Sequence, residues 1–431
     1  MKPKKKAIVV GTGAGGATAA KELQGSYEVT ILEAGQAFRP FGWNLGLIER
    51  VRNCGLLRDE REIQLIFPAM RIRHSAERMV MVNGCALGGT TTLATGNGVR
   101  LGADLQALGI DLEPEFAALE QEIPISTAHQ KRWRPATRRL FEICREMGME
   151  PAPLPKMGDY ERCVSCGRCV LGCPHGVKWD SRKFLEIAVA KGANLRSSCR
   201  VEAIEISGGR ASGVQYRRGW HRETLRADLI VLAAGGFGTP VILEQSGIAC
   251  ERRLFVDPVL CVAGRLENAL QNREISMPFV VQRPGYILSP YFDYLSFFFN
   301  RNWRYPSQDT LGVMIKLADS EAGAVTAARV EKSLTEQDQA RLQEGAALAR
   351  EMLRRLGVTP QEMTEGTLNA GHPGGMLPLT AADAATLHPA RLPENLYVAD
   401  ATLFPHALGN PPILTIMALA RRISAVCRAA G

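Results

Sequence analysis

The segment Ala7–Gly35, AIVVGTGAGGATAAKELQGSYEVTILEAG, decides the fold of this 431-residue chain. An apolar run, a glycine-rich turn, an alanine-rich stretch and a second β-branched run predict a strand, a helix and a parallel strand. Gly11 permits the tight bend, Gly13 lets backbone amides approach a pyrophosphate, and Gly16 lets the helix pack closely on the strand. Glu33 stands where a ribose-binding acid is expected. The segment therefore predicts a Rossmann-like unit that binds a dinucleotide, and the alternative is an ordinary glycine-rich turn.

The sequence predicts one bound dinucleotide. Enzymes that reduce a flavin with NAD(P)H usually carry a second glycine fingerprint, and the later glycine clusters, Gly208–Gly209 and Gly235–Gly238, lack its spacing. If the nucleotide is a flavin, reducing equivalents have to enter and leave through a substrate and another electron carrier.

The composition is that of an ordinary globular protein with a basic excess. Apolar residues make up 46% and charged residues 22%, and the net charge is +8, which suits an acidic partner, an anionic substrate or a membrane surface. No nucleic-acid motif accompanies this charge, so no nucleic acid is expected. A secretory signal is rejected because cleavage would destroy the glycine turn, and no run approaches the length of a membrane span. Eleven cysteines, an odd number, predict reduced thiols in the cytoplasm and favour metal binding or catalysis over disulfides.

Four cysteines form the most specific local motif, Cys163-x-x-Cys166-x-x-Cys169-x-x-x-Cys173 followed by Pro174. Bacterial ferredoxins have this spacing, in which short intervals let three thiolates meet on one iron–sulfur cluster. Zinc fits less well, because structural zinc sites usually combine two separated pairs, and a loop without metal is the other alternative. The motif predicts a 4Fe-4S cluster in preference to a 3Fe-4S cluster. Its fourth ligand is Cys173 or a distant cysteine such as Cys54, Cys85 or Cys199.

The chain resembles the glucose-methanol-choline (GMC) family of FAD oxidoreductases. The residues that carry the resemblance are Leu32–Gly35 (LEAG), Gly88–Thr91 with Arg100, Val201 to Gly247, His372–Gly375, Asn395–Pro405 and Gly409–Ile416. One departure is Ala94, which stands where the family usually has an asparagine. The same segment has no histidine, so the covalent histidine link to flavin of some relatives looks absent.

The resemblance implies which residues contact FAD. The Gly88 pair would lie against the flavin, Val201 beside the adenine, and the segment at Asp400 along the ribityl chain and pyrophosphate. With the glycine turn, the predicted FAD-binding residues are Gly11, Gly13, Gly16, Glu33, Gly88, Gly89, Thr90, Val201, Ala234, Gly235, Asp400 and Ala401.

The resemblance also implies His372 and Asn410 as the catalytic pair. In the family these positions flank the substrate carbinol in front of flavin N5. An imidazole can accept the hydroxyl proton while an amide orients the oxygen. Met376 replaces the usual threonine, and the loop after Asp400 is one residue short, which makes His406 a rival base.

The expected fold class is α/β, with a discontinuous Rossmann-like FAD-binding domain and a smaller α+β substrate domain that contains an antiparallel sheet. The FAD-binding domain is predicted at residues 1–100, 183–253 and 366–431, the substrate domain at 101–160 and 254–365, and a cysteine-rich insert at 161–182. The aromatic stretch Tyr286–Tyr305 is expected in the core of the substrate domain. The alternative is a pocket wall, or a patch that meets a membrane or quinone.

These features predict an FAD-dependent dehydrogenase that oxidises an alcohol or sugar-like carbinol by hydride transfer to flavin N5. Electrons would leave through the iron–sulfur cluster to a ferredoxin, a cytochrome or a quinone. One alternative is a ferredoxin-driven FAD reductase of a carbonyl or activated double bond in an apolar substrate. Another is an electron-transfer subunit with a vestigial site, and a peripheral membrane or subunit contact also stays open.

Overall fold

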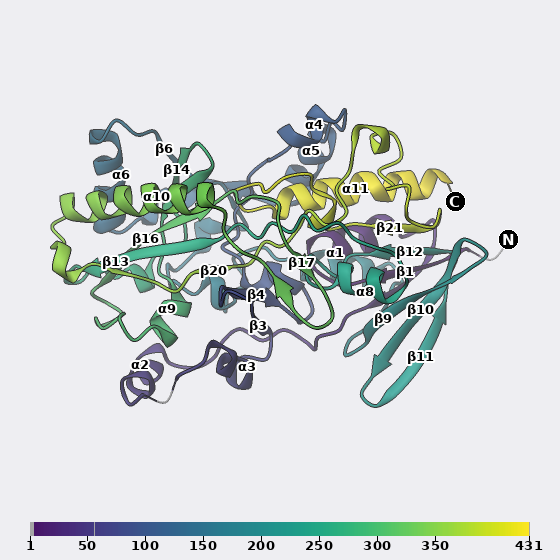
Figure 1. Ribbon diagram of the computed structural model, residues 1–431, viewed down its shortest axis with the longest axis horizontal. Coiled ribbons are helices and arrows are strands. Elements are labelled where there is room, and N and C mark those ends of the chain that lie inside the picture. The colour runs from purple at the N-terminus through teal and green to yellow at the C-terminus, as the bar shows by residue number, and fades with distance from the viewer. Residues whose placement is uncertain (1–3, 56, 431) are drawn as a thin grey trace.

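A five-stranded parallel sheet is assembled from three distant parts of the chain (Figure 1). The structure, a computed structural model, describes residues 4–55 and 57–430. In spatial order the strands are β21 (Leu396–Val398), β12 (Leu229–Leu232), β1 (Lys6–Val10), β2 (Glu28–Leu32) and β8 (Asn194–Arg196). The two central strands β12 and β1 are almost entirely buried, as expected for parallel strands covered on both faces.

Helix α1 (Ala14–Glu22) packs unusually close to the sheet and to the C-terminal helix α11 (Ile413–Ala430). A Cβ atom added at Gly16 would lie 2.1 Å from the carbonyl oxygen of Gly11, and one at Gly15 would lie 1.6 Å from that of Ala399. Gly16 therefore acts in helix–strand packing, as predicted. Gly15 allows α1 to approach a second segment closely, at Ala399, the residue that follows β21.

The second sheet has nine strands and is largely antiparallel, with one parallel pair between β4 and β20. Eight strands follow in the order β3 (Met70–His74), β4 (Val80–Gly84), β20 (Asn369–Ala370), β13 (Val259–Arg265), β16 (Thr310–Leu317), β15 (Tyr286–Pro290), β14 (Phe279–Arg283) and β6 (Pro151–Pro153). The ninth, β19 (Thr364–Glu365), pairs with β13. Helix α10 (Glu336–Arg355) covers this sheet and begins with a capping box between Thr335 and Asp338.

The smaller elements surround these two sheets. A three-stranded antiparallel sheet is formed by β9 (Arg200–Ser207), β10 (Arg210–Arg218) and β11 (His221–Arg226). Two short pairs of strands are β5 (Ile125–Ser126) with β7 (Lys156–Met157) and β17 (Ala324–Val325) with β18 (Val330–Glu331). The remaining α-helices are α2 (Leu45–Asn53), α3 (Ile63–Ile66), α4 (Ala103–Ala107), α5 (Glu113–Glu122), α6 (Pro135–Glu146), α7 (Arg182–Ala190), α8 (Thr239–Gln245) and α9 (Tyr294–Phe299). Within the described ranges, none of the helices combines the length and the apolar character needed to cross a bilayer.

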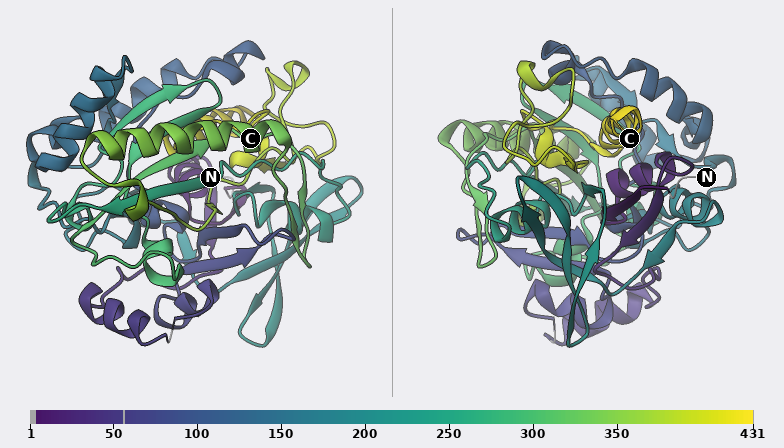
Figure 2. Two further views of the ribbon diagram at one scale, coloured as in Figure 1. Left: turned by 60° about the vertical axis from the view of Figure 1, so that its left-hand side comes forward. Right: turned by 90° about the vertical axis from the view of Figure 1, so that its right-hand side faces the viewer.

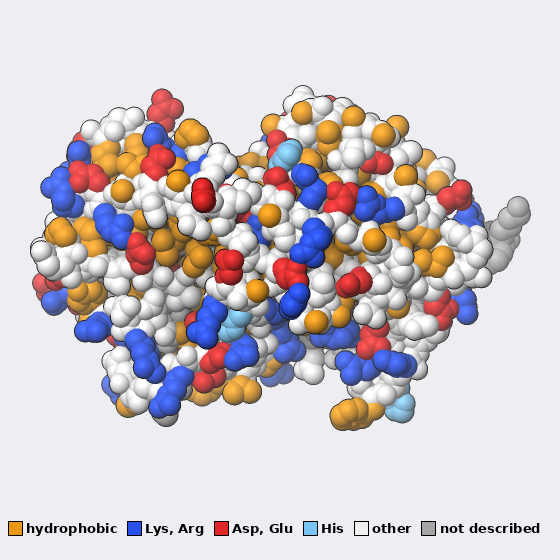
Figure 3. Space-filling model, in the orientation of Figure 1, with side chains coloured by type: hydrophobic (Ala, Val, Ile, Leu, Met, Phe, Trp, Pro, Cys, Tyr) orange, Lys and Arg blue, Asp and Glu red, His pale blue; other side chains and the backbone are white. Residues whose placement is uncertain are grey.

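The predicted α/β class is confirmed, because a parallel sheet with flanking helices adjoins a largely antiparallel one. The parallel sheet forms one lobe and the nine-stranded sheet with α10 the other; both chain ends lie at the parallel-sheet lobe (Figure 2). A notch in the upper edge separates the lobes in Figure 3. The domain boundaries stay a prediction. The hairpin β3–β4, which falls inside the predicted FAD segment 1–100, pairs within the second sheet.

Candidate active site

A cleft of about 1190 Å³ lies at the carboxyl ends of the parallel strands, where nucleotides bind in open α/β sheets. Its floor is built from the residues that directly follow β1, β2, β12 and β21. Of the predicted FAD-binding residues, all but Gly16 and Gly88 line it: Gly11, Gly13, Glu33, Gly89, Thr90, Val201, Ala234, Gly235, Asp400 and Ala401. We refer to it as the dinucleotide cleft.

The dinucleotide cleft has features that fit an anionic, ring-bearing group. A Cβ atom added at Gly13 would meet no atom within 4 Å, so the backbone at the N-terminus of α1 is open to the cleft. The Glu33 carboxylate accepts hydrogen bonds from the amides of Thr12 (3.1 Å) and Gly35 (2.7 Å), and burial raises its pKa. Glu33 therefore fixes the glycine turn while it lines the cleft.

Asp400 organises the opposite side of the dinucleotide cleft. Its carboxylate accepts hydrogen bonds from the amides of Gly235 (2.9 Å) and Thr402 (3.0 Å) and from the hydroxyl of Thr239 (2.5 Å). Burial raises the pKa of Asp400. The segments after β12 and β21 are thus held together by one side chain, which places Ala234, Gly235 and Ala401 on the same wall.

A second cavity of about 170 Å³, the apolar pocket, adjoins the dinucleotide cleft. Its lining is mostly hydrophobic and includes Tyr291, Tyr294, Phe298 and Phe299 from the aromatic stretch. Tyr294, Phe298 and Phe299 also belong to a buried cluster, which they share largely with residues of the predicted FAD segment 1–100, so these three both line the pocket and pack in a core. The residues that line both cavities are Thr90, Ala94, Gly371, His372 and Ile413. His372 therefore lies at the junction of the two cavities.

His372 belongs to a buried network with Asp257 and Lys316. The His372 Nδ1 atom lies 3.2 Å from Asp257 Oδ2, and the Lys316 ammonium donates to the same oxygen at 2.5 Å. The other Asp257 oxygen accepts from the Gly409 amide at 3.1 Å. In the described residues His372 Nε2 has no hydrogen-bond partner, and 26% of the side chain is exposed, at a position that lines both cavities. A carboxylate on Nδ1 favours the tautomer whose Nε2 is a free base.

The charges of this network determine the protonation of His372. Burial lowers the pKa of His372, the Lys316 cation lowers it further, and Asp257 partly offsets both effects. Burial alone would raise the pKa of Asp257, but Lys316 and His372 hold it below its usual range. The imidazole is therefore neutral at neutral pH and can accept a proton.

Asp257 and Lys316 were missed in the sequence, although one signal was present. Lys316 interrupts the apolar strand TLGVMIKL, and a lysine buried in such a strand needs a buried partner. Its partner, Asp257, lies 59 positions earlier in the chain, so the sequence alone does not pair the two residues.

Asn410 stays a predicted catalytic residue. Its amide exchanges hydrogen bonds with Gln282, at 3.0 Å and 3.3 Å, and it does not line the apolar pocket. The rival base His406 is 58% exposed and lies 3.2 Å from Glu321. Of the three candidates, the geometry brings only His372 to the junction of the cavities.

The four motif cysteines line one small cavity of about 20 Å³, which we call the thiol cavity. Cys163, Cys166, Cys169 and Cys173 all contribute to its wall, together with Tyr160, Lys178 and Ile275. Of the distant candidates, Cys85 and Cys199 line the dinucleotide cleft, and Cys54 is exposed. Cys173 is thus the fourth cysteine at this cavity.

Two buried lysines lie near the motif cysteines, and one of them, Lys178, lines the thiol cavity. Lys178 Nζ donates to the carbonyl oxygens of Thr91 (3.1 Å), Thr92 (2.8 Å) and Ala94 (2.7 Å). Lys156 Nζ donates to the carbonyl oxygens of Thr95 and Ser276 and to the side-chain oxygen of Asn97. Among the residues that the structure describes, neither ammonium has a carboxylate ion-pair partner.

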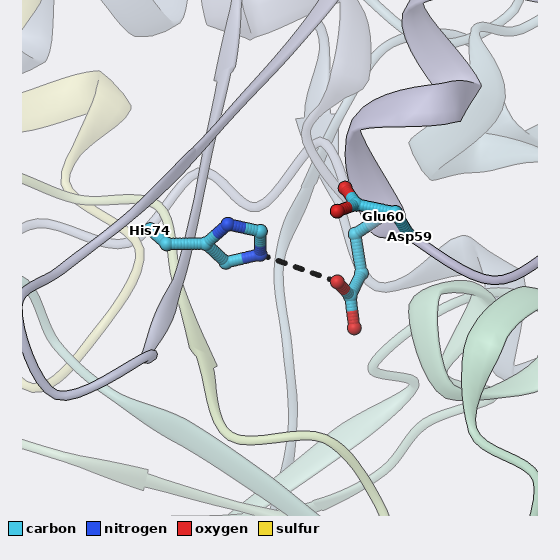
Figure 4. Close-up of side chains that lie close together, drawn as sticks. All are labelled: Asp59, Glu60 and His74. Atoms are coloured by element: carbon cyan, nitrogen blue, oxygen red, sulfur yellow. Dashed lines mark hydrogen bonds and ion pairs between the residues drawn. The ribbon is translucent and has the colours of Figure 1, made fainter.

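Another group of possible ligands lies apart from this motif. Asp59, Glu60 and His74 come close together, with His74 Nε2 3.2 Å from a Glu60 oxygen (Figure 4). Both Asp59 oxygens already accept hydrogen bonds from the Arg61 guanidinium, at 2.8 Å and 2.6 Å. These side chains therefore already form ion pairs with one another and with Arg61, and they give no indication of a metal site.

Comparison with known proteins defines the class. Residues 6–266 match the sequence model of the GMC oxidoreductase family, so the chain belongs to that family. It is an FAD-dependent oxidoreductase that acts on CH–OH donors, as predicted, and its substrate is a small molecule.

Individual relatives agree with this assignment. An uncharacterised protein of Methanocaldococcus jannaschii is 26% identical over 96% of this chain and 97% of its own length. A GMC-type oxidoreductase of Mycobacterium tuberculosis is 30% identical over 61% of this chain, which spans only 43% of that relative. Among solved structures, pyridoxine 4-oxidase from Mesorbium loti has a TM-score of 0.72 at 15% identity, over 98% of this chain and 99% of that one. Formate oxidase of Aspergillus oryzae has a TM-score of 0.71 at 14% identity, over 99% and 98%. At these identities the two structures show the fold.

Two neighbouring glycines should respond differently to alanine. Gly13→Ala is expected to lower FAD retention while the stability of the apoprotein is unchanged, because the new methyl group points into the open dinucleotide cleft. Gly15→Ala should instead destabilise the fold by about 1–3 kcal/mol or more, because its methyl group meets the Ala399 carbonyl. Flavin content after gel filtration and thermal unfolding of the apoprotein separate the two effects. Equal behaviour of the two variants would contradict the assigned roles.

Proposed function

We propose that the protein is a dehydrogenase for a small alcohol with apolar substituents, and that electrons leave it through an iron–sulfur cluster bound by Cys163, Cys166, Cys169 and Cys173. The position of His372 carries the proposal, since this residue lines both the dinucleotide cleft and the apolar pocket. The pocket volume of about 170 Å³ lies below the range of about 300–1,000 Å³ of ordinary ligand sites, which favours a small substrate.

The network around His372 supplies the proton chemistry. When bound, FAD supplies the hydride acceptor and the cluster supplies a one-electron relay. His372 Nε2 accepts the carbinol proton, and Asp257 holds the ring by Nδ1 and stabilises the imidazolium. Lys316 keeps Asp257 ionised. Asn410 is proposed to orient the carbinol oxygen, for which its amide has to leave Gln282.

The buried lysines support an anion in the thiol cavity. Each ammonium donates to three oxygens, which matches the three donors of a protonated lysine. A buried cation without a counter-ion is costly, and a cluster held by four thiolates is an anion that would offset Lys156 and Lys178. The four thiols and the two lysines therefore favour a cluster over a loop without metal.

The thiol cavity also lies close to the dinucleotide cleft. Lys178 lines the thiol cavity and donates to the carbonyls of Thr91 and Ala94, which line the cleft. One segment of chain thus separates the two sites, which supports electron transfer between them.

Anaerobic purification tests the proposal. We expect iron, acid-labile sulfide and FAD in the protein, and bleaching of the flavin band by small alcohols. The Cys166→Ala variant should lose iron and sulfide, but alcohol should still bleach its flavin. Cys54 is exposed, so the Cys54→Ala variant serves as a matched control and should keep its full iron content. If the analysis found zinc, or no metal, the proposal of an iron–sulfur cluster would be overturned. A flavin that no alcohol bleaches, while reduced ferredoxin drives reduction of a carbonyl compound, would favour the reductase alternative.

The cellular partners follow from the same features. We propose a cytoplasmic location, because the eleven cysteines are all free thiols in the described residues. The proposed electron acceptor is a carrier protein or a quinone.

A further inference from the structure

The surface around the thiol cavity is basic. We define the cysteine-loop patch as Val164 together with the basic residues of the loop and of the segments packed against it: Lys131, Arg132, Arg162, Arg168 and Arg273. Val164 is 60% exposed and lies between two of the cysteines that line the thiol cavity. The acids next to these residues in the sequence are Asp159, Glu161 and the buried Glu274, so basic side chains outnumber acidic ones.

The basic residues come from three segments that pack against the loop. The 3₁₀ helix η3 (Ala128–Arg132) is tied to η4 (Tyr160–Arg162), since Lys131 pairs with Glu161 at 3.4 Å and Arg132 donates to the Glu161 carbonyl. The 3₁₀ helix η6 (Gln271–Arg273) also packs against the loop, because a Cβ atom at Gly167 would be 2.0 Å from the Asn272 carbonyl oxygen.

Apart from Lys131, which pairs with Glu161, the basic side chains of the patch form no ion pair with a described residue. Within the described part of the chain, Arg132, Arg162, Arg168 and Arg273 have no carboxylate partner, whereas many other surface arginines form ion pairs. On the face shown in Figure 3, basic side chains are mostly interspersed with acidic ones. Uncompensated charge around one exposed apolar residue attracts and orients an acidic partner.

We propose that the cysteine-loop patch docks an acidic one-electron carrier protein. This inference rests on the proposed function, and it decides between the two classes of acceptor named there. The unpaired basic side chains choose between them, because an acidic protein is attracted to this charge whereas a neutral quinone is not. Each carbinol oxidised yields two electrons and two protons. Two carrier molecules each take one electron, and the protons pass to solvent.

Binding to an acidic plant-type ferredoxin tests the patch by calorimetry on the purified holoprotein, without turnover. We expect affinity that falls steeply between low and high ionic strength. The double variant Arg162→Glu/Arg273→Glu should bind about tenfold more weakly at low salt, or worse. Neither side chain makes a hydrogen bond to a described residue, so iron content should not change. The control Lys5→Glu/Arg218→Glu has the same charge change outside the patch and should bind normally.

Other outcomes separate the two proposals. Equal losses in both double variants would mean that only net charge matters, and would overturn the docking site. Salt-independent binding, or a preference for basic cytochrome c, would also overturn it. If iron, sulfide and alcohol bleaching are present while the patch variant binds normally, the docking site fails and the proposed function stands. If the metal is absent, the proposed electron route fails, whatever the binding result.

Discussion

Replacement of His372 by alanine is expected to lower alcohol oxidation by about 10²- to 10⁴-fold, because the carbinol proton then has no acceptor at the junction of the two cavities. FAD content should be unchanged, since the cleft is also held by Glu33 and Asp400. Stopped-flow measurement of flavin bleaching by alcohol under anaerobic conditions isolates the chemical step.

His406→Ala is the matched control, because His406 is exposed and, among the described residues, pairs with Glu321 alone. It should retain nearly full rate. A His372→Ala enzyme that bleaches at the wild-type rate would eliminate His372 as the base, and a slow His406→Ala enzyme would transfer that role to the rival.

Replacement of Lys316 by methionine should lower the free energy of unfolding by about 3–5 kcal/mol, because it removes one member of a fully buried ion pair and leaves Asp257 uncompensated. It should also move the acid limb of the pH–rate profile to higher pH. The Lys316 cation lowers the pKa of His372, so its loss raises that pKa and keeps the imidazole protonated at higher pH. Denaturant unfolding and the pH dependence of bleaching give the two measurements.

A surface variant supplies the comparison for Lys316. Arg139→Met breaks an exposed ion pair with Glu146 and should cost less than about 1 kcal/mol, with no change in the pH profile. Suppose that Lys316→Met and Arg139→Met lose the same free energy of unfolding and that the acid limb of the pH–rate profile does not move in Lys316→Met. The buried network then does not set the pKa of His372.

The parts of the fold that depend on local sequence could be predicted. The glycine turn at Gly11–Gly16 is specified within a few residues, and it occurs in the structure between β1 and α1. The cysteine spacing likewise brings four thiols to one cavity because the intervals are short. The α/β class followed from the order of the apolar runs and from the glycine-rich turn between them.

The parts that depend on long-range contacts could not be predicted. Asp257 meets His372 across 115 positions and Lys316 across 59, so no local pattern links them. Asn410 was chosen for its place in a motif, and its amide pairs with Gln282, 128 positions earlier. Sequence patterns identify a residue type at a turn, whereas the partner of that residue is decided by the packing of the second sheet.

The order of the strands has a consequence for biosynthesis. The last strand of the parallel sheet, β21, ends at Val398, and Asp400 and helix α11 follow it. A nascent chain on the ribosome therefore lacks one wall of the dinucleotide cleft until β21 and helix α11 have been translated. FAD cannot be fully enclosed before that point, and until β21 pairs with β12 the apolar strands of the parallel sheet lack their native cover and are prone to aggregate.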